Sequence, residues 1–316
     1  MPREKYQYVV PPELNRKRLD QVLSELCPEH SRSRLQNWIR SGYVTVDERA
    51  LRQKDQVFTD QLIAIDAEVD EQEDWEKQAI PLDIVFEDEE ILIINKPAGL
   101  VVHPGAGNPD NTLLNALLYH AECLSMVPRA GIVQRLDKDT SGLMVVAKSL
   151  TAHTYLVEEL QQRNIKRQYE AVVYGVMTAG GSVDAPIGRH PRQRKRMAVN
   201  ENGKQATTHY RILKKYPAHT YVKLQLESGR THQIRVHMLH INYPIVGDPV
   251  YTARRRSVKN CSVELRETLQ QFLRQALHAC QLDFIHPVSD QALSFSAPLP
   301  EDIQHLLRAL DNDASR

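Results

Sequence analysis

The N-terminal part of the chain combines helical and strand patterns. In RLDQVLSEL (18–26) the leucines and the valine recur at the i, i+3, i+4, i+7 spacing of one helix face. A second apolar face follows at 35–39, and Gly42 is a residue typical of a helix end. The segment YVTV (43–46) then alternates as a strand does. We predict an N-terminal extension at 1–15 and a small α/β-type domain at 16–75.

From residue 84 the pattern changes to short strands with turn residues between them. The strand candidates are DIVFEDEEILIINKP, GLMVVAKS, YEAVVYGVM, ATTHYRILKKY and TYVKLQLES. Helical patterns occur at Thr112–Tyr119 and Thr151–Arg163. Many strands with few intervening helices favour an α+β fold on a mostly antiparallel mixed sheet over a doubly wound fold. We assign this larger domain to 91–316.

Charge is distributed unevenly along the chain. The 316 residues carry 40 Lys+Arg and 40 Asp+Glu, which gives a net charge of zero. Residues 66–90 hold 12 acidic residues and 1 basic residue, whereas residues 91–316 hold 28 basic and 19 acidic residues. We expect an acidic linker at 76–90. The neutral total therefore does not exclude a nucleic-acid partner for the larger, basic domain.

Composition excludes other classes of protein. No apolar run approaches the roughly 18 residues of a membrane helix, and the first residues lack the apolar core of a signal peptide. The four cysteines form no C-x-x-C pair, which is typical of thiols in a reducing compartment. We expect a cytoplasmic protein with no membrane contact.

The segment RAGIVQRLDKDTSGLMVVAKS (129–149) offers the most candidate chemistry. Charged and hydroxyl side chains at 135–141 lie between the apolar GIV and the predicted strand LMVVAK. Loops that lead into strands commonly present functional groups. By itself, however, the pattern also fits a turn whose Asp and Ser side chains cap its own backbone.

Three ordered motifs, NKPAGLVVHP, RLDKDTSGL and GRTHQIRVH, resemble those of the RluA family of pseudouridine synthases. The resemblance extends from about residue 84 to residue 300, and the pattern at 16–65 resembles the S4 RNA-binding module. It implies isomerisation of uridine in RNA, with no cofactor and no metal. It also implies that Asp137 is the catalytic carboxylate. Asp139 is the rival, because a carboxylate pair is the arrangement of a glycosidase.

The resemblance assigns further roles within these motifs. Tyr169 corresponds to the active-site tyrosine, with an aromatic face for the flipped base. Arg235 corresponds to the arginine that pairs with the catalytic Asp, and Arg230 becomes a phosphate contact. Arg135 is expected to fill the space that the flipped base leaves. The histidines of GRTHQIRVHMLH offer an alternative zinc site, but their spacing matches no standard ligand pattern.

Two features concern RNA docking. The expected RNA contacts outside the motifs are Arg32, Arg34, Arg194, Lys195 and Arg196, and a further basic run lies at 254–256. Gln134 stands where the family usually has His. Gln forms hydrogen bonds but does not titrate, so we expect a structural or RNA-contacting role at this position.

The resemblance also suggests a substrate. We expect 23S rRNA of the large ribosomal subunit precursor, in particular the helix 69 stem-loop, modified by a monomeric enzyme. Three alternatives stay open: another rRNA or tRNA stem-loop, an RNA-binding ribosome-assembly factor with secondary catalysis, and a nucleoside or glycoside hydrolase that uses Asp137 and Asp139.

Overall fold

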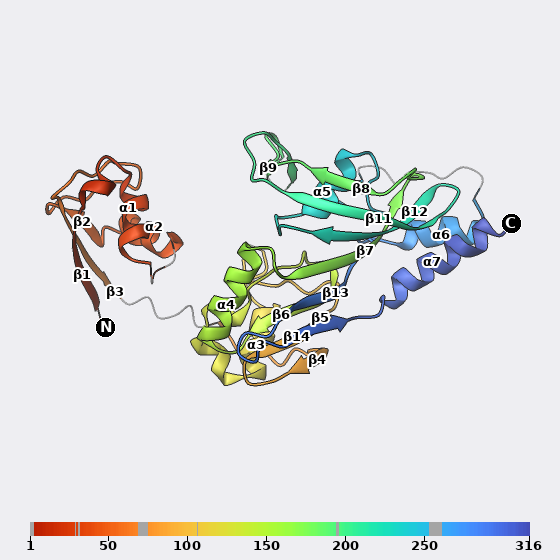
Figure 1. The fold of residues 1–316 in the computed structure, drawn as a ribbon, viewed down its shortest axis with the longest axis horizontal. Helices are drawn as coiled ribbons and strands as arrows, with labels where there is room; N and C mark the ends of the chain where they lie inside the picture. The colour runs from red at the N-terminus through yellow and green to blue at the C-terminus, as the bar shows by residue number, and fades with distance from the viewer. Residues whose placement is uncertain are drawn as a thin grey trace. The chain divides into compact units, whose positions relative to one another are not determined.

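A computed structural model gives the arrangement of the chain (Figure 1). It describes residues 3–28, 30, 32–68, 75–105, 107–193, 196–252 and 261–316. The chain divides into two compact units, 1–74 and 75–316, and each is described by itself. Within the described residues, none of the helices is both long and apolar enough to cross a membrane.

Unit 1 is a three-stranded antiparallel sheet with two α-helices. The strands, in the order β1-β3-β2, are β1 (Arg3–Val9), β3 (Leu62–Glu68) and β2 (Val44–Val46). A short 3₁₀ helix η1 (Pro12–Leu14) precedes α1 (Leu19–Leu26) and α2 (Arg32–Arg40). The apolar face predicted at 19–26 is buried together with Leu35 and Trp38 of α2. The apolar side chains at this helical spacing therefore form part of the core of this unit.

The structure corrects two of the expected boundaries. The extension at 1–15 contains β1, which pairs with β3 from Arg3↔Glu68 to Val9↔Leu62. The linker at 76–90 lies in unit 2: Asn115 Nδ2 donates a hydrogen bond to the Glu76 carbonyl oxygen (2.8 Å), and β4 (Ile84–Glu87) pairs with β5 (Ile91–Lys96). The acidic composition extended the expected linker over residues 84–87, although the apolar pattern there already indicated a strand.

Unit 2 is built on one large mixed sheet. The strands run in the order β4-β5-β6-β13-β7-β12-β11-β8, and β14 pairs with β13. Only the contact between β6 and β13 is parallel among the described pairs of this sheet. A separate two-stranded sheet holds β9 and β10. The bounds are β6 (Ser141–Ala147), β7 (Lys166–Tyr174), β8 (Gly181–Asp184), β9 (Ile187–Arg189), β10 (Met197–Val199), β11 (Thr207–Lys215), β12 (His219–Leu226), β13 (Leu277–Ile285) and β14 (Ala292–Ser296).

Helices cover both faces of this sheet near β5 and β6. Ile91 and Ile93 join one core cluster, and Leu92 and Ile94 join another, because successive strand side chains point to opposite faces. α4 (Leu150–Gln161) packs in the first cluster. The second cluster contains residues of α3 (Leu113–His120), α5 (Gln233–His240), α6 (Val263–Gln271) and α7 (Glu301–Ala314). Burial on both faces explains the unbroken apolar run ILII.

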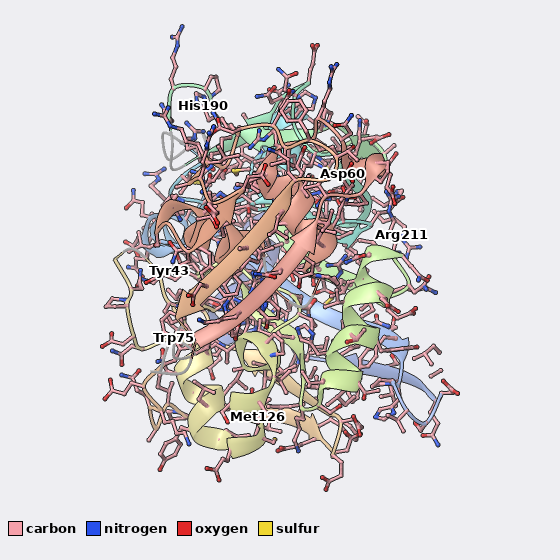
Figure 2. All side chains as sticks on the ribbon, turned by 90° about the vertical axis from the view of Figure 1, so that its left-hand side faces the viewer. Tyr43, Asp60, Trp75, Met126, His190 and Arg211 are labelled. Atoms are coloured by element: carbon pink, nitrogen blue, oxygen red, sulfur yellow. The ribbon has the colours of Figure 1, made fainter. Side chains whose placement is uncertain are left out.

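The α+β class with a mostly antiparallel mixed sheet is confirmed. α3 and α4 match the predicted helices to within two residues at each end. The 3₁₀ helices η2 (Glu122–Met126) and η3 (Pro128–Gly131) connect α3 to the loop before β6. Figure 2 labels Trp75, where unit 2 begins, and Met126 at the end of η2.

Candidate active site

A cleft of about 1060 Å³ lies in unit 2 and collects most of the motif residues. Its walls come from segments that are far apart in the sequence. They include 101–104, 132–140, Arg167 and Tyr169 of β7, 226–235, and 249–250. The three motifs that carried the resemblance therefore meet at one surface.

Asp137 lies in the loop that leads into β6. The Thr140 backbone N–H donates to the Asp137 carbonyl oxygen (3.0 Å), which forms the turn. Gly142 then passes against β13 with φ +118°, and a Cβ there would lie 2.2 Å from the Ala279 carbonyl oxygen. Only glycine allows this approach, so Gly142 fixes the start of β6, and with it the loop, against the centre of the sheet.

Arg235 on α5 joins two carboxylates. Its Nη1 donates to Asp137 Oδ2 (2.8 Å), while Nε and Nη2 donate to Asp248 Oδ2 and Oδ1 (2.7 and 2.9 Å). The Asp248 side chain is fully buried, and that of Asp137 is 15% exposed. Burial opposes the charge on Arg235, but the bonds to Asp248 and the neighbouring Asp137 raise its pKa on balance. The pair expected between Arg235 and Asp137 is therefore present as geometry.

Tyr251 connects this ion pair to the rest of the site. The Arg235 guanidinium lies 5.0 Å from the centre of the Tyr251 ring. The Met197 backbone N–H donates to the Tyr251 hydroxyl (2.9 Å), which lies 2.8 Å from His232 Nδ1. The hydroxyl can accept a second hydrogen bond or donate its own proton, so this contact fits a hydrogen on either Nδ1 or the second ring nitrogen, Nε2, of His232.

His232 brings this second ring nitrogen toward the candidate carboxylate. Its Nε2 lies 3.9 Å from Asp137 Oδ1, the oxygen that Arg235 does not contact. The residue is in the left-handed region (φ 57°) at the start of α5, a strained backbone that clusters at functional sites. Burial lowers the pKa of His232, although the Asp137 charge opposes this, which favours the neutral ring.

Tyr169 lies on β7 and is 6% exposed. Burial raises the pKa of its phenol, with the Arg167 charge opposing and the Asp137 charge adding to the shift. The phenol therefore keeps its proton at neutral pH. Tyr169 offers the cleft an aromatic face and a hydroxyl that can donate.

Buried cations hold the loop around Asp137. Lys96 Nζ donates to the carbonyl oxygens of Pro97, Leu100 and Lys138 (2.7, 2.9 and 3.0 Å). Burial lowers the pKa of Lys96 to about 8. Arg274 Nη1 donates to the Asp139 carbonyl oxygen (3.2 Å). Asp139 lines the same cleft, but Arg235 contacts Asp137 and not Asp139 among the described hydrogen bonds.

The other expected contacts have different placements. Arg135 and Arg230 are exposed and line the cleft. The Arg196 guanidinium lies 5.1 Å from the centre of the Tyr251 ring, the same ring that the Arg235 guanidinium contacts. Gln134 lines the cleft, and its Nε2 is buried without a hydrogen-bond partner among the described residues. Arg194, Lys195 and residues 254–256 lie outside the described residues.

In unit 1 two of the three arginines of α2 contact acidic side chains. Arg32 Nη2 donates to Asp20 Oδ2 (3.4 Å), and Arg34 Nη2 donates to Glu4 Oε1 (3.3 Å). Arg34 also lies 4.8 Å from the Trp38 ring centre. Burial would raise the pKa of the Asp20 carboxyl, but hydrogen bonds from Arg18 and Gln36 lower it on balance. Part of the positive charge on this surface is therefore balanced within the unit.

The histidines of GRTHQIRVHMLH do not converge. His232 points toward Asp137, whereas His237 is buried between Thr208 Oγ1 (2.9 Å) and the Ala185 carbonyl oxygen (3.0 Å). His240 ends α5. The zinc alternative therefore has no geometric support from these residues.

The sequence analysis missed three residues of the site. Asp248 and Tyr251 belong to GDPVY, a segment to which the sequence analysis assigned no role. Arg167 lies two residues before Tyr169, and that alternation along a strand was a usable signal. Nothing in the sequence brings Asp248 to Arg235, because the contact depends on the turn after α5.

Comparisons with known proteins identify the family and the N-terminal domain. Residues 90–240 match the model of the RNA pseudouridylate synthase family, and residues 17–57 match the S4 domain. The chain is 56% identical to ribosomal large subunit pseudouridine synthase D of Pseudomonas aeruginosa, covering 96% of this chain and 95% of that protein. For the protein of that name from Escherichia coli K12 the identity is 54%, with 94% and 91% covered.

Two solved structures resemble the fold over about three quarters of this chain. The human protein RNA pseudouridylate synthase domain containing 4 matches with a TM-score of 0.57 and 28% identity, covering 72% of this chain and 92% of that one. Human RNA pseudouridylate synthase domain containing 1 matches with a TM-score of 0.53 at 23% identity, covering 74% and 96%. The second likeness concerns the fold alone.

Proposed function

The chain belongs to the RNA pseudouridylate synthase family and is a pseudouridine synthase, and we propose that it converts uridine to pseudouridine in large-subunit rRNA with Asp137 as the catalytic carboxylate. In this reaction the bond from N1 to C1′ breaks and a bond from C5 to C1′ forms. The C5 proton leaves, and N1 gains one. No redox change occurs and no group is added, so the proposal needs no cofactor.

The observation that carries the proposal is the ion pair between Asp137 and Arg235 at the cleft. A carboxylate can attack the ring, attack the sugar or take a proton from the sugar. Each of these roles requires an anion, and the neighbouring guanidinium stabilises one. Arg235 leaves Oδ1 of Asp137 without contact from itself, so one oxygen stays available to the nucleotide.

Tyr169 completes the proposed site for the base. Its position in the cleft suits stacking on a flipped uracil, and its protonated hydroxyl suits donation to the base or sugar. Arg135 lines the same cleft from the residue two places before Asp137, as a group that replaces a flipped base requires.

Two observations support large-subunit rRNA as the substrate. The relatives at 54–56% identity are named as large-subunit synthases, and the match extends over the S4 domain as well as unit 2. Among rRNA sites we propose uridines of the helix 69 stem-loop. Single-stranded loop bases can leave their stack at lower cost than paired ones.

The test is mapping of pseudouridine in rRNA from a strain that lacks the gene. The strain is complemented with the wild-type gene or with Asp137→Asn, which keeps the shape of the side chain. We expect wild type to restore modification in helix 69 and the variant to bind RNA without modifying it. Restored modification elsewhere would refute the helix 69 site. Modification by the purified variant would refute the role of Asp137.

A further inference from the structure

Arg167 is a buried cation in the wall of the cleft. It lies on β7, is 8% exposed and lines the cleft beside Tyr169. Its Nε is buried without a hydrogen-bond partner, and no ion pair involves its guanidinium among the described residues. A buried charge without a partner is costly to fold, so its presence here requires an explanation.

Two of the carboxylates that line the cleft contact other cations. Glu227 accepts from Arg163 Nη1 (2.5 Å) and lies 2.8 Å from His209 Nε2. Asp137 accepts from Arg235. No ion pair joins Arg167 to these two carboxylates or to Asp139, the third that lines the cleft, within the part of the chain that the structure describes.

The backbone at Gly229 lies close to this guanidinium. A Cβ at Gly229 would lie 3.0 Å from Arg167 Nη1, closer than side-chain carbons normally approach. Arg230 follows directly and lines the same cleft, with its Nε donating to the Gln205 carbonyl oxygen (3.2 Å). Gly229 therefore lets the backbone that leads into Arg230 lie close to Arg167, and both arginines line one cleft.

We propose that Arg167, together with Arg230, binds the phosphodiester next to the target uridine. This inference rests on the proposed function and names a ligand group of the same cleft. Arg167 and Tyr169 share one face of β7, roughly 7 Å apart along the strand. That separation suits one nucleotide whose base stacks on Tyr169 while its phosphate accepts from Arg167. A planar guanidinium matches two phosphate oxygens at once.

Substrates with one uncharged linkage test the site directly. Stem-loop RNAs carry a methylphosphonate at single positions flanking the target uridine, and their affinity is measured for wild type, R167Q and R167K. For wild type we expect one flanking position to weaken binding about tenfold, as loss of one charge-assisted contact does. For R167Q the methylphosphonate at that position should weaken binding by less than a further twofold, because the contact between Arg167 and the phosphate is already lost.

Two further readouts separate this role from a structural one. R167Q should lower the slope of log affinity against log salt by about 0.7–1, with KM raised more than kcat is lowered. Its melting temperature without RNA should equal or exceed that of wild type, because an unpaired buried charge has been removed. R211Q is the matched control: Arg211 is exposed on β11, outside the cleft, and is labelled in Figure 2.

The results that would refute this phosphate site differ from those that would refute the proposed function. Additive losses from R167Q and the methylphosphonate would overturn the inference. So would the absence of any sensitive flanking position in wild type, which needs no variant at all. A wild-type protein that forms no pseudouridine in rRNA would instead refute the proposed function, and the binding measurements would still decide the phosphate site.

Discussion

Asp137 and Asp248 contact the same arginine, yet their removal should have opposite consequences for stability and activity. In Asp248→Asn, an amide N–H replaces Oδ2, the oxygen that accepts from Arg235 Nε at 2.7 Å. A donor then faces a donor inside the fold, where the Asp248 side chain is fully buried. In Asp137→Asn, Arg235 keeps both of its bonds to Asp248, and the altered side chain borders the cleft.

The magnitudes follow from burial. Loss of a hydrogen bond to a charged group costs about 1.5–3 kcal/mol, and loss of one partner of a buried pair costs about 3–5 kcal/mol. Because Asp137 still balances part of the charge, we expect D248N to lower the free energy of unfolding by about 3 kcal/mol. For a unit of this size that is a fall in melting temperature of about 10 °C. D137N should cost less than about 1 kcal/mol.

Activity should show the reverse order. Thermal unfolding followed by circular dichroism measures stability, and release of tritium from RNA labelled at C5 of uridine measures turnover. D137N should lose turnover with a nearly unchanged melting temperature. D248N should fold and keep some turnover, reduced about 100-fold because Arg235 is no longer held in place. Equal destabilisation by the two variants, or an unchanged melting temperature in D248N, would refute the anchoring of Arg235 by Asp248.

Three other predictions concern buried groups. His219 is 1% exposed, and burial lowers its pKa to about 4. Between about pH 4 and 6.5 the unfolded chain therefore binds a proton at this residue that the folded chain does not. The free energy of unfolding should fall by about 3 kcal/mol as pH drops through this range. In urea titrations the stability of H219F should no longer fall over this pH range, whereas the exposed-site control H305Q should keep the dependence of wild type. An H219F variant whose stability falls with pH as much as that of wild type and H305Q would contradict the prediction. K96M removes the buried amine that donates to three carbonyl oxygens, so we expect a loss of about 3 kcal/mol in the same titration. A loss below about 1 kcal/mol would show that the loop does not depend on this amine. Q134H should change tritium release less than about threefold at neutral pH, and a much larger gain would show that a titrating group at this position takes part in the reaction.

Local patterns in the sequence predicted much of the fold. The helical spacing at 19–26 and the strands around ILIINK and LMVVAK were legible because neighbouring residues set them. The C-terminal elements α6, α7 and β13 were not predicted, although β13 lies at the centre of the sheet. Its segment LHACQLDFI mixes polar and apolar residues without a clear period. Strand pairing, which the local pattern does not contain, decides its structure.

The site divides in the same way. Motif resemblance selected Asp137, Tyr169 and Arg235 from the sequence, and the fold brings all three to one cleft. Their catalytic roles stay predictions. The resemblance did not select Asp248 or Arg167, because the importance of each depends on its surroundings. Asp248 shares Arg235 with Asp137, and Arg167 forms no ion pair with a carboxylate among the described residues.

The sequence by itself determined the kinds of chemistry that the protein carries and the order in which the chain presents them. Periodicity and motif order are properties of the sequence, so both can be recognised before any long-range contact is known. Only the tertiary structure decided how charges are shared. Arg235 and Asp137 are 98 residues apart, and whether a buried cation has a carboxylate partner depends on the packing of β7, α5 and the loops between them. Electrostatic energy in a buried site depends on distance and burial, and the sequence order specifies neither.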